Sequence, residues 1–581
     1  MRRVVAVAAA LAAVLVLPSA ALAHGRHDHQ RHHHERDTNV QLLAINDFHG
    51  NLQPPSGSSG RIATGPTTTV DAGGVEYLAT HMNTLRAEGP RRTIGIAAGD
   101  LIGASPLISA LFHDEPTIEA MNALDLEVSG VGNHEFDEGV EELLRMQNGG
   151  CHPVDGCQGS DPFTGAFFQY LAGNVFYAGT NRTILPPYEI KRVGRHHKAK
   201  IAFVGLTLEG TPLIVTPAGV AGLEFRDEIV TINALVKRLK RRGVQSIVVL
   251  VHEGGQQNAP FVGGFMNVNA CENFSGAIKP IVEALDKEVD VVVSAHTHQP
   301  YICNFGGIVT TSASSFGRLI TDIDLRIDGR SRDVESVEAV NRIVTRDVAK
   351  DPTETQIVEK YNERSAPIAN RVVGSITADI TRSVAAGESG ETALGDVIAD
   401  AQLASTARTD FGGAVVAFMN PGGIRADLVF NDNSGGEAPG QVTYNELFTV
   451  QPFSNVMTVK TMTGDMIYRL LEQQQFGTPG GVPVRILQVS RGFTYSYDSR
   501  RPEGSRVTPG SVAINGVPVD KAASYRVAMN NFLATGGDGF SVFNEGTDQL
   551  GGEIDLDAAV NYFMNNSPIA PGPRDRITRL G

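Results

Sequence analysis

The sequence predicts an α/β protein of at least two domains, in which the first domain holds a mostly parallel β-sheet buried on both faces. The chain has 581 residues, which exceeds what one hydrophobic core usually contains. From residue 40 onward, short apolar runs alternate with amphipathic, helix-like segments, as strands and crossover helices do in such sheets. Hydrophobic residues make up 41% of the chain and charged residues 19%, which is typical of folded globular proteins.

Residues 1–23 are predicted to be a signal peptide. A basic Met-Arg-Arg start is followed by the apolar run Val4–Leu17 and by the small-residue cleavage site Ala-Leu-Ala at 21–23. A retained membrane anchor is the alternative, but the apolar run is shorter than the ~20 residues that a spanning helix needs. No later stretch is long and apolar enough to span. We therefore expect a secreted or extracytoplasmic protein, in the cell envelope or a periplasm-like space, without a transmembrane segment.

Residues 24–38 form a His-rich leader that we interpret as solvated and disordered. Its six histidines are at positions 24, 27, 29, 32, 33 and 34. Such a tract can bind zinc or copper, but this spacing fixes no coordination geometry.

The net charge and the cysteines limit the partners and the compartment. A formal net charge of −15 argues against a nucleic-acid polymer as partner, because neutralising its backbone needs clustered Lys and Arg. A small anionic substrate remains compatible with this charge. Four cysteines in an exported chain favour two disulfides, Cys151–Cys157 and Cys271–Cys303. Zinc binding by the first pair is the alternative, although no second Cys pair has ligand spacing. The sequence does not indicate the oligomeric state.

The predicted strands of the first domain end in polar residues. The apolar runs are Val40–Ile45, Thr93–Ala98, Leu126–Val131, Ile201–Leu206, Ser246–Val251 and Val289–Ser294. Helix-like segments between them are Gly74–Arg86, Ile229–Arg242 and Ile278–Lys287. Five of the six runs lead into Asp, Asn or His, either directly or after one Gly or Ala, at the strand ends where open α/β sheets place their sites.

These strand ends supply a candidate metal site of seven residues. They are Asp47, His49, Asp100, Asn133, His252, His296 and His298. A nitrogen and oxygen ligand set without Cys suits Zn, Mn, Fe or Co. Seven ligands are too many for one tetrahedral ion and suit two ions, with Asp100 as the natural bridge. Two such ions can clamp phosphoryl oxygens and generate a hydroxide nucleophile.

The turn at residues 132–137, Gly-Asn-His-Glu-Phe-Asp, carries a further pair. Asn133 can offer its oxygen to a metal, and His134 can offer a proton. Asp137 follows His134 at helical spacing and can therefore hold the second nitrogen of that imidazole.

In this order, Asp-x-His, Gly-Asp, Gly-Asn-His-Glu, a lone His and Ala-His-x-His resemble the calcineurin-like metallophosphoesterases. The resemblance implies an αββα sandwich for residues 39–340. It also implies that Asp47, His49 and His298 hold one metal, that Asn133, His252 and His296 hold the other, and that both share Asp100. His134, oriented by Asp137, would donate to the phosphate or to the leaving group. Ala295 stands where the family usually has Gly.

A connector and a second domain are expected to follow. Residues 341–365 form the connector, whose polar segment Thr353–Glu363 is helix-prone after Pro352 and is closed by Pro367. From about residue 366 to 581 the pattern changes, and Leu394–Ala407 is predicted to be a helix.

Four segments of the second domain resemble the C-terminal domain of the secreted bacterial 5'-nucleotidase and UDP-sugar hydrolase family. They are Glu-Thr-Ala-Leu-Gly-Asp at 391–396, Asn-Pro-Gly-Gly-Ile-Arg at 420–425, Gln-Pro-Phe-Ser-Asn at 451–455 and the Gly-rich loop 531–539. The loop lacks the Lys-Ser/Thr of a triphosphate cradle. The resemblance implies a nucleotide site with five residues: Phe453 and Phe532 stacked on the base, Asp538 on the ribose, and Asn420 and Arg425 on base or phosphate. Gly390 replaces an anchoring Arg of some relatives, so Arg425 or Arg382 is expected to bind the phosphate.

Together these features predict an exported dimetal phosphohydrolase that dephosphorylates nucleoside 5'-monophosphates. A metal-held hydroxide would attack phosphorus while His134 and Asp137 assist, at a site between the two domains. The same chemistry on UDP-sugars, 2',3'-cyclic nucleotides or dinucleotides remains open. The non-enzymatic alternative is a secreted metal-binding or interaction protein.

Overall fold

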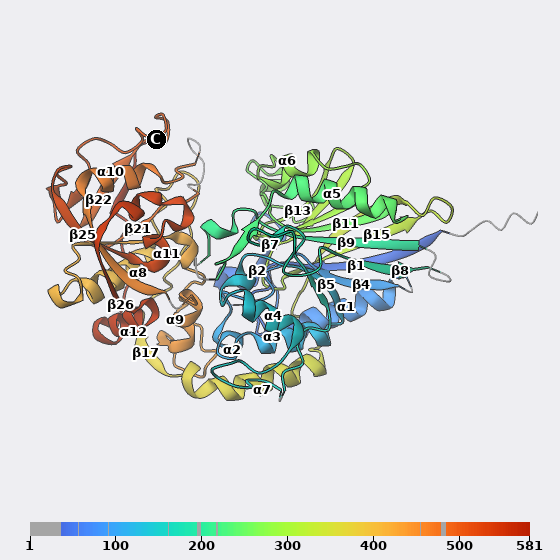
Figure 1. Cartoon of the computed structure of the whole chain (residues 1–581). Coiled ribbons are helices and arrows are strands. Elements are labelled where there is room, and N and C mark those ends of the chain that lie inside the picture. Colours follow the sequence, from blue (N-terminus) through green and yellow to red (C-terminus); the bar gives the residue numbers. More distant parts are fainter. Residues whose placement is uncertain are drawn as a thin grey trace, which may run out of the picture.

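The computed structural model describes residues 37–55, 57–90, 92–160, 162–194, 199–215, 219–453, 455–477 and 484–581. The predicted signal peptide and residues 24–36 of the leader lie outside the described residues. Thr38, which we assigned to the leader, begins the first strand. Within the described ranges, no helix is both long enough and apolar enough to cross a membrane. The chain forms two lobes joined along one side by a long helix (Figure 1).

The first lobe contains two six-stranded mixed sheets, as the predicted αββα sandwich requires; the strand pattern alone indicated a mostly parallel sheet. The first sheet has the order β16-β15-β1-β4-β5-β6 and the second the order β13-β14-β12-β11-β9-β8. In each sheet four neighbouring strands run parallel. The first sheet continues at one side with two antiparallel pairings, β1 with β15 and β15 with β16, and the second has an antiparallel strand, β13 or β8, at each edge. The strands of the first sheet are β1 (Thr38–Ile45), β4 (Thr93–Ala97), β5 (Leu126–Gly130), β6 (Gln169–Leu171), β15 (Leu319–Ile327) and β16 (Val334–Ile343). Those of the second are β8 (Tyr188–Val193), β9 (Ala199–Thr207), β11 (Ser246–His252), β12 (Val291–Ser294), β13 (Pro300–Phe305) and β14 (Ile308–Ala313).

The two sheets pack face to face, and helices cover their outer faces. Alternate side chains of both sheets, such as Leu42 and Ile96 from the first and Phe203 and Leu250 from the second, share one buried core. The outer face of the first sheet packs on α1 (Val75–Glu88), α3 (Glu115–Ala123) and α4 (Val140–Asn148). That of the second packs on α5 (Glu228–Arg241) and α6 (Ile278–Glu283). The predicted αββα sandwich is therefore confirmed, and burial of both faces explains why central strands such as β11 and β12 are almost entirely apolar.

The predicted helices of this domain form, with shifted ends. The largest difference is at α6, which ends at Glu283 although helix was expected to Lys287. Both predicted disulfides, Cys151–Cys157 and Cys271–Cys303, are present. Shorter elements of the lobe are β2 (Arg61–Ala63), β3 (Thr69–Asp71), β7 (Val175–Tyr177), β10 (Leu223–Phe225) and α2 (Leu107–Ala110).

The connector contains one helix, α7 (Pro352–Ala369), which starts where the sequence predicts it to start. Asp351 caps it by accepting hydrogen bonds from the amides of Thr353 and Glu354. The expectation that Pro367 ends the helix is wrong, since the helix continues for two residues beyond it. Pro367 removes one amide only in the last turn, on the exposed face, where water can satisfy the freed carbonyl. The helix packs along α1, α2 and α3 and reaches the second lobe at α9 (Figure 1).

The second lobe is a smaller α/β domain. Its main sheet has the order β21-β18-β25-β20-β26, beside a four-stranded sheet β24-β23-β22-β27 and the pair β17-β19. Its helices are α8 (Ala393–Thr406), α9 (Tyr444–Val450), α10 (Gly464–Glu472), α11 (Asn531–Ala534) and α12 (Asp555–Asn566). Its strands are β17 (Val372–Ser375), β18 (Val416–Met419), β19 (Gln441–Thr443), β20 (Val456–Thr463), β21 (Gln488–Val489), β22 (Phe493–Tyr497), β23 (Ala513–Ile514), β24 (Val517–Pro518), β25 (Ser524–Asn530), β26 (Thr547–Ile554) and β27 (Ile577–Arg579).

Candidate metal centre and substrate cleft

The seven predicted metal ligands meet at one edge of the sandwich. They follow or end the parallel strands β1, β4 and β5 of the first sheet and β11 and β12 of the second. Because both sheets present the carboxyl ends of these strands at the same edge, residues up to 251 positions apart come into contact range. The sandwich therefore builds the site from both of its sheets.

The first group of ligands is Asp47, His49 and His298, whose ligand atoms all lie within 4.8 Å of one another. Nε2 of His49 and Nε2 of His298 are 3.1 Å apart, and Nε2 of His298 is 3.5 Å from a carboxylate oxygen of Asp47. Asp47 and His49 are completely buried. Burial lowers the pKa of His49 and of His298 well below the usual range, so both imidazoles are neutral and have a free lone pair.

The second group is Asp100, His252 and His296, again within 4.8 Å of one another. Nε2 of His252 is 3.0 Å from Oδ2 of Asp100, and Nδ1 of His296 is 3.0 Å from Oδ1 of Asn133. The same Oδ2 of Asp100 lies 3.6 Å from Nε2 of His49, which belongs to the first group. Asp100 therefore occupies the position between the two groups that a bridging carboxylate requires.

These residues fit a pair of divalent ions. Nε2 of His252 is buried and, among the described residues, has no hydrogen-bond partner of good geometry. Burial disfavours a proton on His252, yet the charge of Asp100 outweighs this and raises the pKa of His252 to about 10. Burial also opposes ionisation of Asp100, but the charges of His252 and His134 hold its pKa well below the usual range. A buried imidazole nitrogen 3.0 Å from a buried carboxylate oxygen, without a hydrogen-bond partner among the described residues, is an arrangement that a divalent ion between the two atoms would satisfy once His252 has lost its proton.

The backbone is constrained at the same positions. Asp47, His49, Asp100, His296 and His298 all have positive φ angles, between 48° and 68°. Few residues other than glycine adopt this conformation, and its concentration at candidate ligands is typical of functional sites. Glycine is needed beside them: a Cβ on Gly132 would lie 2.1 Å from a carboxylate oxygen of Asp100.

Glu135 holds the loops in place, and sequence reasoning gave it no role. Its carboxylate accepts hydrogen bonds from the amides of Asp100 (2.9 Å), Leu101 (2.8 Å) and Gly132 (2.6 Å). Burial raises its pKa to about 7. The only available signal was its place inside the Gly-Asn-His-Glu motif. Main-chain carbonyls orient two of the imidazole ligands. The carbonyl oxygen of Ala98 accepts a hydrogen bond from Nδ1 of His252, and that of Gly103 accepts one from Nδ1 of His49.

His134 lies at the mouth of the centre and belongs to neither group of ligands. Its Nδ1 is 2.9 Å from Oδ2 of Asp137, and its backbone amide donates to Asp100. Burial opposes a charge on the ring, but Asp137 and Asp100 outweigh it and raise the pKa of His134. With Nδ1 held by Asp137, Nε2 is the nitrogen free to donate a proton.

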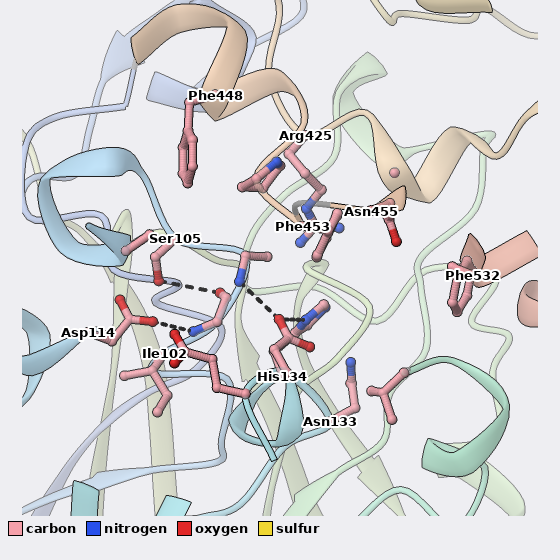
Figure 2. A pocket seen from close by; sticks show the side chains of 18 of the residues that line it. Ile102, Ser105, Asp114, Asn133, His134, Arg425, Phe448, Phe453, Asn455 and Phe532 are labelled. Atoms are coloured by element: carbon pink, nitrogen blue, oxygen red, sulfur yellow. Dashed lines mark hydrogen bonds and ion pairs between the residues drawn. The ribbon is translucent and has the colours of Figure 1, made fainter. Parts of the chain in front are cut away.

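A cleft of about 950 Å³ opens from His134 between the two domains. The five predicted nucleotide residues line it, together with Asn133, which we also expected to face the phosphate: Asn420, Arg425, Phe453, Phe532 and Asp538. Phe453 and Arg425 lie over His134, while Phe532 lies farther along the cleft (Figure 2). Arg425 comes from the turn after β18 and lines the cleft. Burial and the charge of Arg382 lower the pKa of its guanidinium, while the charges of Asp100, Asp137 and Asp47 oppose this shift. The guanidinium of Arg425 therefore extends from the second domain towards the candidate metal centre of the first.

Hydrogen bonds fix the far end of the cleft. The side-chain amide of Asn420 donates to Asp538 (3.0 Å) and accepts from Asn530 (3.0 Å). Asn455 and Arg485 also line the cleft, and sequence reasoning missed both. Arg485 donates to the carbonyl of Asp538 from a segment 53 residues away, so no local motif could have revealed it.

Arg382, the other expected phosphate ligand, is not part of the cleft wall. Its guanidinium donates instead to the hydroxyl of Ser59 in the first domain (2.9 Å) and lies 3.8 Å from Asp427. The carbonyl of Gly390, where some relatives have Arg, accepts a hydrogen bond from Gln488. Of the two candidates, Arg425 is therefore the cation that faces a ligand in the cleft.

Comparison with known proteins agrees with this architecture. Residues 40–300 match the calcineurin-like phosphoesterase family, and residues 372–545 match the 5'-nucleotidase C-terminal domain. The chain is 31% identical to the endonuclease YhcR of Bacillus subtilis over 93% of its own length, but spans only 41% of that relative. It is 24% identical to the snake venom 5'-nucleotidase of Crotalus adamanteus over 93% of this chain and 88% of the relative. The crystal structure of a 5'-nucleotidase precursor from Thermus thermophilus has the same fold, with a TM-score of 0.72, 24% identity, and coverage of 94% of this chain and 99% of that one.

Proposed function

The chain belongs to the family that joins a calcineurin-like phosphoesterase domain to a 5'-nucleotidase C-terminal domain, and from this premise we propose that it is an exported dimetal phosphohydrolase. Its substrates are nucleoside 5'-monophosphates, which it converts to nucleoside and phosphate. One observation carries the proposal: the predicted nucleotide residues of the second domain and His134 of the first line the same cleft.

The two ligand groups would hold the ions, with Asp100 between them. When bound, two divalent ions polarise a phosphoryl group and make water more acidic, which promotes in-line displacement at phosphorus. Their ligand set of imidazole, carboxylate and amide oxygen suits Zn, Mn, Fe or Co.

The protein's own groups complete the reaction. His134, held at Nδ1 by Asp137, gives a proton from Nε2 to the leaving alkoxide of the ribose. Oδ1 of Asn133 faces His296, which leaves the Nδ2 group of Asn133 as a donor to the charge on the phosphoryl oxygens. Arg425 reaches the same region from the second domain and binds the phosphate.

The second domain holds the nucleoside. Phe453 and Phe532 offer aromatic faces for the base, and stacking contributes about 1–3 kcal/mol per base without selecting among bases. Asp538, positioned by Asn420, accepts hydrogen bonds from the ribose hydroxyls.

The proposal of export rests on the signal peptide expected at residues 1–23, and the two disulfides support an oxidising compartment.

A substrate panel tests the proposal. Protein stripped of metal is reloaded with Zn, Mn or Mg, and product release is measured from AMP, UDP-glucose, 2',3'-cyclic AMP and a dinucleotide. We expect AMP to give the highest kcat/KM by at least tenfold. A higher value for any other member would replace the monophosphate assignment with that substrate class, and no turnover with any metal would favour the non-enzymatic alternative.

A further inference from the structure

Asn530 lies at the wall of the substrate cleft, where β25 passes into α11. It is the last residue of the strand and the N-cap of the helix, and its side chain is almost completely buried, at 1% exposure. The proposed hydrolysis uses no atom of Asn530. Its hydrogen bonds nevertheless reach the supports of both groups that are expected to hold the nucleoside, Phe532 and Asp538.

The oxygen of the Asn530 side chain caps α11. Oδ1 accepts a hydrogen bond from the backbone amide of Leu533 (2.8 Å), which the first turn of a helix would otherwise leave without a partner. The helix carries Phe532, whose ring packs so closely on Gly537 that a Cβ at this glycine would lie 2.6 Å from it. The cap therefore fixes the aromatic face expected for the base and, through it, the loop that bears Asp538.

The same cap fixes the orientation of the amide group of Asn530. A backbone N–H can only donate, so the atom that faces Leu533 is the oxygen, and the nitrogen points elsewhere. Nδ2 of Asn530 donates to Oδ1 of Asn420 (3.0 Å). With its oxygen engaged there, Asn420 turns its own Nδ2 towards Asp538 and donates to Oδ2 of that carboxylate (3.0 Å). Each amide thus sets the orientation of the next group.

The outcome at the cleft wall is a carboxylate held ready to accept hydrogen bonds. The guanidinium of Arg485 donates to the main-chain carbonyl of Asp538 (2.8 Å) and so also holds its backbone, whose φ angle is 57°. Ribose hydroxyls are donors that suit such an acceptor. If Asn420 were turned the other way, its oxygen would face the carboxylate, and the two acceptors would repel each other.

We propose that Asn530 is a positioning residue of the nucleoside site. It orients Asn420 so that Asp538 accepts hydrogen bonds from the ribose hydroxyls, and it caps the helix that carries Phe532. The inference rests on the proposed nucleotide substrate and deepens it: the preference of the cleft for a ribose with free hydroxyls depends on Asn530.

Nucleoside binding tests this network without any turnover. Adenosine and 2',3'-dideoxyadenosine are titrated into the zinc-loaded full chain by calorimetry. Asn530→Asp keeps an oxygen that caps α11 but replaces the donor to Asn420 by a second acceptor, so the amide of Asn420 should turn. The matched control is Asn531→Asp, because Oδ1 of Asn531 also accepts from a backbone amide, that of Val456 (3.0 Å), but Asn531 does not line the cleft.

We expect the parent chain to bind adenosine about tenfold more tightly than the dideoxynucleoside, which lacks the donors to Asp538. Asn530→Asp should reduce this ratio to less than about threefold, and Asn531→Asp should keep it. Asn420→Ala should reduce the ratio as well. Adding Asn530→Asp to Asn420→Ala should then have little further effect, because both changes break the same network.

The proposal is overturned if Asn530→Asp, folded by circular dichroism, keeps the ratio of the parent. Equal affinity of the parent for the two nucleosides would also overturn it. If Asn420→Ala kept the ratio while Asn530→Asp lost it, Asn530 would act by another route and the proposed network would be wrong. These affinities do not depend on turnover, so the substrate panel can reject hydrolysis of monophosphates independently of this result.

Discussion

The ring of Phe453, from the second domain, stacks on the ring of His134, from the first, with centroids 5.6 Å apart and 22° between their planes. The guanidinium carbon of Arg425 lies 5.8 Å from the centroid of the same Phe453 ring. The expected base-binding residue and the expected proton donor are thus in contact across the domain boundary. Groups from both domains are therefore placed to act on one substrate, and five predictions follow from this arrangement and from the fold.

Replacing His134 by Ala should lower kcat for AMP by about 10²–10⁴-fold, because the leaving ribose oxygen loses its proton donor. Asp137→Asn should lower it less, since the imidazole remains but its tautomer is no longer fixed. Both variants should retain the parent's metal content, as neither residue belongs to a ligand group. A loss of only a few-fold in His134→Ala would assign the proton donor to another residue.

Phe532→Ala should lower kcat/KM for AMP by roughly tenfold or more, because one stacking face of the base is lost. It should leave hydrolysis of p-nitrophenyl phosphate, which has no base, nearly unchanged. Phe453→Ala should affect both substrates, since Phe453 also packs on His134. Equal effects of Phe532→Ala on the two substrates would contradict a base-binding role.

Removal of metal by a chelator should abolish phosphate release, and zinc or manganese should restore it. Among ligand variants, Asp100→Asn should reduce the metal content by two ions, because Oδ2 of Asp100 lies near both groups. His298→Gln should reduce it by one. If the two variants lost the same number of ions, Asp100 would not be shared.

Arg425→Lys keeps the positive charge but loses the planar guanidinium, and it should raise KM for AMP by about tenfold. Arg382→Lys is the matched comparison, because Arg382 bonds Ser59 and does not line the cleft. We expect the second change to leave KM within about twofold. The reverse order would make Arg382 the phosphate ligand and would require it to move into the cleft.

Because of Glu354, on α7, the folded protein should become less stable as the pH rises. Its carboxyl is 1% exposed and has no hydrogen-bond partner among the described residues, and burial raises its pKa from 4.5 to about 9. Between these values the folded state binds a proton that the unfolded state has lost, so stability is full below pH 4.5 and declines as the pH rises towards 9. Glu354→Gln should therefore raise the free energy of unfolding at pH 7 by about 1–3 kcal/mol and flatten this decline.

Thermal or urea unfolding between pH 5 and pH 9 measures the effect. Glu359→Gln, at an exposed position of the same helix, is the control and should follow the parent curve. Parallel curves for Glu354→Gln and the parent would show that Glu354 is ionised in the folded protein.

Local pattern was enough to predict much of the fold. Apolar runs such as Ser246–Val251 identified strands because burial on both faces favours apolar residues at nearly every position. The start of α7 was predictable because Asp351 and Pro352 satisfy and shape the first turn by themselves. Its end was not, because whether Pro367 stops a helix depends on where the freed carbonyl points. Assignment of strands to two sheets was also beyond local pattern, since the runs are alike in composition.

The sequence by itself determined the chemistry of this protein: which side chains follow which strands, their order, and the family motifs that they form. That information is local, because a strand end and the two or three residues after it are fixed by the chain itself. Only the tertiary structure decided that the predicted ligands meet at one edge of the sandwich, that Arg425 lines the cleft while Arg382 donates to Ser59, and that His113 meets His152 and Asp155. These are contacts between distant segments, and they depend on how two sheets and two domains pack. The turn at residues 132–137 shows the difference: Asn133 and His134 are neighbours in the chain, yet the fold places Asn133 against His296 and His134 against Phe453.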